Sequence, residues 1–352
     1  QAVQETAEDE EEQPPFLRNS ILEILTFGLT QKTVGTVVVL TAVSSEIFSL
    51  MNPRDAAEVA NALDLKVLLG FFMVAFAGSY LWSAGKALLT HAGFQLRHVG
   101  DRLQTIEGLL TRRKVEIPQG KVQLIEIHEP ILRRAMGFGS IFIETAAFGM
   151  ADGEIRQSEG VVPMAESSRF KEVVALAAPQ VRADPWSVKL LPPHPRALYR
   201  NAVIRMIRAA FMAGLVIFML RGHSWSWWAL ALIPLAIPVA WLDWSWQGWL
   251  ITENAVITRR GFFTRQTWLV DRAKVQSVHV DQGPVMKLHG LGKVLVRVAG
   301  TELPLPDIGF DQAQECLQEL RRRLGPQEKL DGQDAGDDPG GVGGKTGPQG
   351  VS

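Results

Sequence analysis

The stretch Gly261-Phe-Phe-Thr-Arg265 repeats Gly108-Leu-Leu-Thr-Arg112 at an offset of 153 residues. At the same offset and without a gap, Lys274-Val-Gln276 falls on Lys121-Val-Gln123. Each copy follows a long apolar segment. Self-similarity at a fixed offset is typical of a duplicated structural unit. The sequence therefore predicts one unit, a membrane hairpin followed by a small domain (a module), that is present twice.

Apolar residues make up 47% of the chain and gather in four blocks. These blocks cover residues 33–51, 67–87, 203–220 and 225–244. A bilayer core about 30 Å thick needs about 20 mostly apolar residues in helical form. Tryptophans flank the last block on both sides, as expected for rings that prefer the headgroup layer. We therefore expect four spans in two hairpins, with buried core helices as the alternative.

Basic residues lie beside the predicted modules and are rare in the short hairpin loops, since loop 221–224 holds only Arg221. Such a bias places the modules and both termini in the cytoplasm. The single Cys316 agrees with a reducing compartment.

The second copy shows the module most clearly. Residues 255–270 predict two strands joined near Gly261, because glycine suits the positive φ of a hairpin turn. Residues 275–280 and 293–299 alternate apolar and polar side chains, as half-buried strands do. Apolar residues from 310 to 324 recur at helical spacing. Several short antiparallel strands and one closing helix predict a small, partly open β-barrel or sandwich.

These patterns divide the chain into eight parts. We expect a disordered acidic segment at 1–15, a connector helix at 16–32, a transmembrane hairpin at 33–90, a first module at 91–180, a linker at 181–202, a second transmembrane hairpin at 203–247, a second module at 248–324 and a disordered tail at 325–352. In the first module, the closing helix is expected from about 168 to 178. Because 16–21 resembles 198–203, which precede the second hairpin, a further module upstream is an open alternative.

Three stretches of the second module form a distinctive series: Leu269-Val-Asp-Arg-Ala-Lys-Val-Gln-Ser-Val278, Asp281-Gln-Gly-Pro284 and Leu288-His-Gly-Leu-Gly292. They resemble the bacterial pleckstrin-homology-like (PH-like) domain of YdbT-like membrane proteins. The resemblance covers most of 33–324 and implies a mixed α and β membrane protein of the bacterial inner membrane, with helical hairpins interleaved with PH-like domains. The first copy departs from it at His128-Glu-Pro130. The resemblance implies a fold and a location but no reaction.

Other motifs favour structural roles. Gly137-Phe-Gly139 and Gly290-Leu-Gly292 each lead into a predicted strand, whereas phosphate loops lead into helices. His128 and its neighbouring glutamates match no zinc spacing, and Cys316 lies on the apolar face of the closing helix. Glu46 lies near the end of the first span, where a charged side chain can reach the interface. We therefore expect no catalytic residue, no metal, no cofactor and no enzymatic activity.

Basic residues on or beside the first hairpin of each module are the binding candidates. They are Arg112, Arg113 and Lys114 in the first copy and Arg259, Arg260 and Arg265 in the second. A basic side chain near an anionic leaflet gains about 1 kcal/mol, and a plain solvated face is the alternative. The two copies carry different residues at some aligned positions, where their functions could differ. His128 of the first copy aligns with Asp281 of the second, and Arg113 and Lys114 align with Gln266 and Thr267.

Together these features predict a non-enzymatic integral membrane scaffold. Its cytoplasmic PH-like modules would bind a membrane or cytoplasmic protein, a peptide, or anionic lipid headgroups of the bilayer. A nucleic-acid partner is not expected, because the modules are held at the membrane. The alternative function is a component of a membrane transport or export system in which the helices form a polar path.

Overall fold

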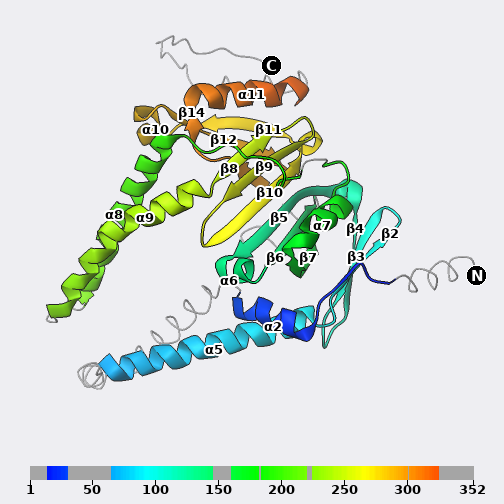
Figure 1. Cartoon of the computed structure of the whole chain (residues 1–352), viewed down its shortest axis with the longest axis horizontal. Helices are drawn as coiled ribbons and strands as arrows, with labels where there is room; N and C mark the ends of the chain where they lie inside the picture. Colours follow the sequence, from blue (N-terminus) through cyan, green and yellow to red (C-terminus); the bar gives the residue numbers. More distant parts are fainter. Residues whose placement is uncertain are drawn as a thin grey trace, which may run out of the picture.

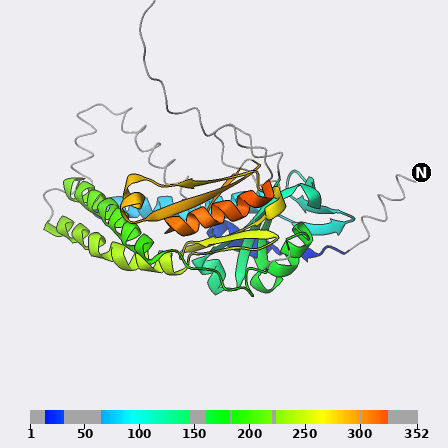
Figure 2. The ribbon, with the colours of Figure 1, turned by 90° about the horizontal axis from the view of Figure 1, so that it is seen from above.

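The computed structural model describes residues 14–30, 65–145, 160–181, 184–219, 224–299 and 301–324. Within these residues, long helices extend from one side of a body of β-strands, as Figures 1 and 2 show. Some predictions concern residues outside this part of the chain. They are the first span (33–51) with Glu46, residues 1–13 of the acidic segment, and the tail 325–352.

Three helical segments account for the apolar blocks that the structure describes. Helix α5 (Leu65–His91) includes the predicted second span, α8 (Pro195–Met219) includes most of the third, and η3 (Ser224–Ala231) continues into α9 (Leu232–Ser245) over the fourth. By length and composition, Pro195–Phe218 and Ser226–Ser245 could cross a membrane. In the most apolar 18-residue stretch of these two helices, only 6% and 11%, respectively, is buried. This exposure does not fit the alternative of core helices.

A capping box begins helix α2 (Ile21–Thr30), which lies in the expected connector. The backbone N–H of Ser20 donates to the Glu23 carboxylate, and the N–H of Glu23 donates to the Ser20 hydroxyl. Helix α2 packs on the C-terminal part of α5, where Gly28 lies against Ala84. A Cβ at Gly28 would lie 2.7 Å from the Cα of Ala84, so this approach requires glycine.

Two antiparallel sheets flank the centre of the molecule, one mainly from each copy. The first also includes residues 17–18 of the connector, which form a strand and not the helix expected from residue 16. The first has the order β1-β2-β3-β4 and consists of β1 (Leu17–Arg18), β2 (Gln95–Val99), β3 (Arg102–Glu107) and β4 (Arg113–Pro118). In the second, β12 (Leu291–Val298) pairs with β11 (Ser277–Asp281), β13 (Thr301–Pro304) and β14 (Ile308–Gly309). The strands expected near 275–280 and 293–299 are thereby confirmed.

The central sheet has six antiparallel strands in the order β7-β6-β5-β10-β9-β8. Its members are β5 (Val122–Pro130), β6 (Phe138–Thr145) and β7 (Gly160–Glu166) from the first copy, and β8 (Gly248–Ile251), β9 (Ala255–Arg260) and β10 (Thr264–Asp271) from the second. The copies meet where β5 pairs with β10, from Leu124 opposite Val270 to Pro130 opposite Thr264. The sequence predicted a separate barrel in each copy; instead, one sheet runs through both.

Short helices complete each module. Helix α6 (Ile131–Ala135) follows β5, and α10 (Pro284–Leu288) follows β11 at the equivalent place in the second copy. The predicted closing helices are confirmed as α7 (Phe170–Ala177) and α11 (Phe310–Leu324). Helix α11 packs against β11 and β12, and Figure 2 shows it lying along the strands.

The two largest hydrophobic cores each contain side chains from both copies. Ile125 and Ile127 of β5 pack in one core together with Ile257 and Leu269 of the second copy. Leu124 points to the opposite face of β5 and belongs to the other core, with Val270 and the strands of the second copy. Because successive strand residues face opposite sides of a sheet, β5 supplies both cores. The shared sheet thus unites the two copies in one packed body.

A buried ion pair lies at one end of this junction. Glu129 on β5 is only 1% exposed, and Arg265 on β10 stands directly opposite it. The guanidinium donates two hydrogen bonds to this carboxylate, with Nε 2.7 Å from Oε2. Two hydrogen bonds from one guanidinium offset the free-energy cost of removing the carboxylate from water.

Loss of the Arg265 guanidinium tests this junction. Arg265→Ala leaves the buried Glu129 carboxylate without its partner, and breaking a buried pair costs about 3–5 kcal/mol. We expect the free energy of unfolding in detergent, measured by denaturant titration, to fall by that amount. Arg297→Ala is the matched control, because the Arg297–Glu302 pair is solvent-exposed and such pairs contribute about 0–1 kcal/mol. Equal losses in the two variants would contradict a buried junction.

The close approach of α2 and α5 gives a second test. Gly28→Ala places a methyl group against the backbone of α5, and overpacking of this kind costs about 1–3 kcal/mol. We expect a lower melting temperature in detergent. Gly85→Ala, in α5 with nothing within 4 Å of the added Cβ, should leave the melting temperature unchanged or raise it. A Gly28→Ala protein as stable as Gly85→Ala would rule out the tight contact.

Candidate functional site

The structure separates the six basic candidates into an exposed group and an engaged group. Arg112, Arg113 and Lys114 are exposed at the turn before β4 and at the start of that strand. The Lys114 ammonium lies 3.5 Å from the Glu116 carboxylate, also at the surface. These three side chains therefore remain accessible to a partner.

The three candidates of the second copy are half-buried, and Arg259 and Arg265 form hydrogen bonds within the protein. Arg265 forms the buried pair with Glu129, and Arg259 donates to the carbonyl of Pro185 at 3.1 Å and to the hydroxyl of Thr267 at 3.2 Å. Burial lowers the pKa of Arg259 and that of Arg260 from the usual arginine value. The acidic residues Asp307 and Asp243 oppose this shift at Arg260. These contacts connect the second copy to the linker and to the first copy.

Both hairpin turns lie against the long helices. The turn before β4 is bonded to the end of α5, because Gly108 N–H donates to Ala92 O at 2.9 Å and Leu109 N–H donates to Leu89 O at 3.0 Å. In the second copy, the Phe262 ring lies 5.8 Å from the ring of Trp246, just after α9. Gly108 and Gly261 both have positive φ, so the turn predicted at Gly261 is confirmed. The hairpin turns therefore mark the helix-bearing side of the body.

The outer edge of β4 is open in the part of the chain that the structure describes. The 153-residue offset makes β4 the equivalent of β10, and β10 is paired on both edges, with β9 and with β5. By contrast, β4 pairs only with β3 among the described strands. An open edge presents unpaired backbone N–H and C=O groups that can accept another strand. Among the described strands, the first copy thus leaves unpaired the edge that is paired in the second copy.

Sequence reasoning missed this edge, although a signal for it existed. Arg113 and Lys114 on β4 correspond to Gln266 and Thr267 on β10. Charged residues are common on free strand edges, whereas neutral ones suit a paired interior strand. The difference between the copies therefore marks which of the two equivalent strands is exposed.

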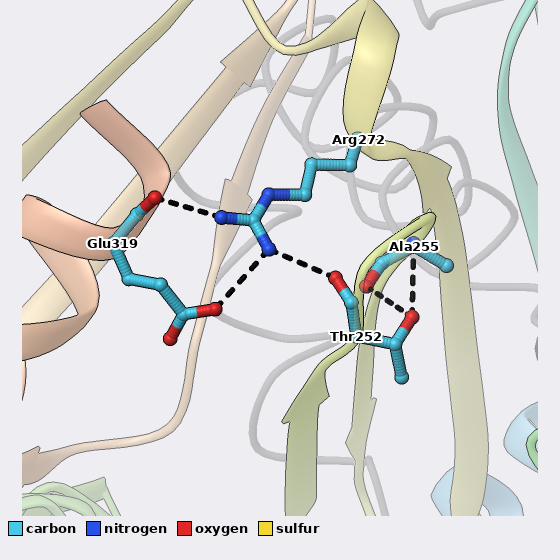
Figure 3. Close-up of polar contacts among 4 residues, drawn as sticks. All are labelled: Thr252, Ala255, Arg272 and Glu319. Atoms are coloured by element: carbon cyan, nitrogen blue, oxygen red, sulfur yellow. Dashed lines mark hydrogen bonds and ion pairs between the residues drawn. The ribbon is translucent and has the colours of Figure 1, made fainter. Parts of the chain in front are cut away.

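The motif that carries the family resemblance has structural roles. Arg272 donates to Thr252 O at 3.0 Å and to the Glu319 carboxylate and carbonyl on α11, as Figure 3 shows. Asp271 accepts a hydrogen bond from the N–H of Ala273, which shapes the turn after β10. Lys274 donates to Gly120 O of the first copy at 2.7 Å. The motif thus fastens the closing helix to its strands and one copy to the other.

The remaining chemical candidates are part of the packing. His128 Nε2 lies 2.6 Å from Glu126 Oε1. The described residues contain no group of three or more histidine, cysteine, aspartate or glutamate side chains that could hold a metal ion. Burial raises the pKa of the Cys316 thiol to about 11, which keeps it protonated near neutral pH. Gly137 and Gly290 have positive φ and form turns, as expected.

Comparison with known proteins agrees with this architecture. Residues 56–180 and 203–324 match the family model of the bacterial PH domain. The chain is 23% identical over 334 residues to the UPF0699 transmembrane protein YdbT of Bacillus subtilis (strain 168), an alignment that covers 89% of this chain and 66% of that protein. The chain therefore spans slightly less than two thirds of the length of this relative. No solved structure is significantly similar to it. The two matched segments include both copies of the repeat and cover most of the chain. The protein therefore belongs to the bacterial PH domain family.

Proposed function

We propose that this protein is a non-enzymatic, multi-pass membrane scaffold whose PH-like modules lie in the cytoplasm and bind a protein partner along the outer edge of β4. One observation carries the proposal: β10 is paired on both edges, while the equivalent edge of β4 is open among the described strands. An extended segment added to such an edge gains main-chain hydrogen bonds, and its side chains supply specificity.

The membrane assignment is supported by the helices and by the relative. Helices α8 and α9 carry large exposed apolar side chains such as Phe211, Phe218 and Trp241, which water does not favour. Helix α5 and the α8–α9 pair extend from the same side of the β body (Figures 1 and 2), so one bilayer could hold both. The relative from Bacillus subtilis is named a transmembrane protein.

A cytoplasmic orientation is supported by the charges at the module end of the second hairpin. Arg196, Arg200 and Arg205 lie in the first part of α8, next to the second module. Arg205 pairs with Asp243 of α9 at 2.6 Å, so the two helices are joined by a polar contact near this end. Lysine and arginine beside spans favour the cytoplasmic side.

The geometry favours a protein partner over lipid headgroups. Arg259 and Arg265 form contacts within the protein and Arg260 is half-buried, which leaves three exposed basic side chains of the six candidates. Three such residues would contribute about 3 kcal/mol at an anionic leaflet. A strand partner uses the same side chains and, in addition, the backbone groups of the whole β4 edge. Lipid capture is therefore the competing outcome of the test below.

Photo-crosslinking from β4 tests the proposal in cells. A photoreactive amino acid replaces Lys114 on the open edge, and, as the matched control, Gln318 on the exposed face of α11. We expect a protease-sensitive adduct of increased mass from position 114 and none from position 318, because only β4 offers an open strand edge at the labelled residue. A lipid adduct alone, or no adduct from position 114, would refute a protein partner at this edge.

A further inference from the structure

We propose that β4 of one molecule pairs with β11 of a second copy of this chain, so that the β5–β10 pairing inside each molecule is repeated between molecules. This inference rests on the proposed function of the β4 edge and names its partner. The occupant is a strand that every molecule of this chain itself carries.

The repeat offset shows which strands are equivalent. Adding 153 to the residues of β4 gives 266–271, which belong to β10. Subtracting 153 from the residues of β11 gives 124–128, which belong to β5. Since β10 pairs with β5 inside the molecule, β4 and β11 are the equivalent pair that remains.

Both remaining strands lie at the ends of their sheets. In the described part of the chain, β4 pairs only with β3 and β11 pairs only with β12. The two copies are joined head to tail, and such a contact uses two different surfaces and leaves one of each kind unfilled. The open edge of β4 on the first copy is therefore complementary to the open edge of β11 on the second copy.

The internal register, transferred by the same offset, predicts the contacts between molecules. Inside the molecule, Gln266 stands opposite His128, and their side-chain nitrogens are 3.2 Å apart. The equivalent positions place Arg113 opposite Asp281, a pair of opposite charges at two exposed positions. Opposite charges that stand directly across two paired strands stabilise the pairing. The residues that differ between the copies thus make the outer edges complementary in charge.

A second internal contact transfers in the same way. Lys274 donates to Gly120 O across the internal junction at 2.7 Å. The equivalent of Lys274 is Lys121, which is exposed at the end of the β4–β5 connection, and the equivalent of Gly120 is Ala273. Lys121 of one molecule would therefore reach the Ala273 carbonyl of the next.

The arrangement of the helices permits this assembly in a membrane. The internal junction relates two modules whose helices, α5 and the α8–α9 pair, extend from the same side of the body (Figures 1 and 2). A second molecule added with the same relation would keep its helices on that side. Head-to-tail contacts of this kind produce a ring or an open row.

Disulfide formation between differently tagged full-length molecules in proteoliposomes tests the inference. Arg113→Cys in one molecule and Asp281→Cys in the other place two cysteines opposite each other, with Cα atoms about 4.5–5.5 Å apart. That separation suits a disulfide. The native Cys316 does not compete, since it is buried and burial raises the pKa of its thiol to about 11. We expect a mixed dimer on oxidation.

The controls separate register from chance collision. Lys114→Cys with Val280→Cys is a second in-register pair and should cross-link as well, which guards against disruption of the Arg113–Asp281 contact. Arg113→Cys with Ser277→Cys is four residues out of register, which separates the two cysteines by about 13 Å along the strand. This pair should not cross-link. Each single-cysteine protein alone should stay monomeric on a denaturing gel. Absence of both in-register dimers, or equal yields in and out of register, would overturn the inference.

The two proposals can fail separately. A foreign protein captured from Lys114, with no in-register disulfide, would refute pairing between copies and leave the β4 edge as a protein-binding site. A dimer-sized adduct of this chain from Lys114 together with both disulfides would support both proposals. Lipid capture alone, with no disulfide, would refute both.

Discussion

The antiparallel pairing of β5 with β10 is the constraint on which the rest of the structure depends. It joins strands from the two copies in one sheet and sends β5 side chains into both cores. The buried Glu129 carboxylate is stable there because Arg265 stands opposite it. The relation between the two modules, and thus between the helices they carry, is set by this junction. The protein is better described as one double module than as two tethered domains.

This constraint explains where a partner can bind. Side chains that look available for binding, such as Arg259 and Arg265, are used to hold the double module together. Among the described strands at the ends of their sheets, β4 and β11 are the equivalent pair that the internal junction leaves unfilled. In the function proposed above, a partner strand binds these edges by main-chain pairing, and the exposed charges beside them select which strand is accepted.

The elements were predictable from the sequence, whereas their long-range pairing was not. Alternation and glycine turns located β9 and β10, and helical spacing located α7 and α11. Alternation shows which face of a strand is buried but does not identify the neighbouring strand. The pairing of β5 with β10 joins residues 136 apart at Glu129 and Arg265. For the same reason, Arg265 was predicted as a surface candidate, since nothing local shows that a buried carboxylate stands opposite it.

Hydrogen exchange of the full-length protein in lipid nanodiscs, followed by mass spectrometry, tests the shared sheet most directly. If one sheet unites the copies, the amides of β5 and β10 open together, and peptides from both strands exchange only with global unfolding. The account therefore predicts equal, maximal protection of 124–130 and 264–270. Full exchange of one strand while the other remains protected would contradict it, because separate modules would open independently.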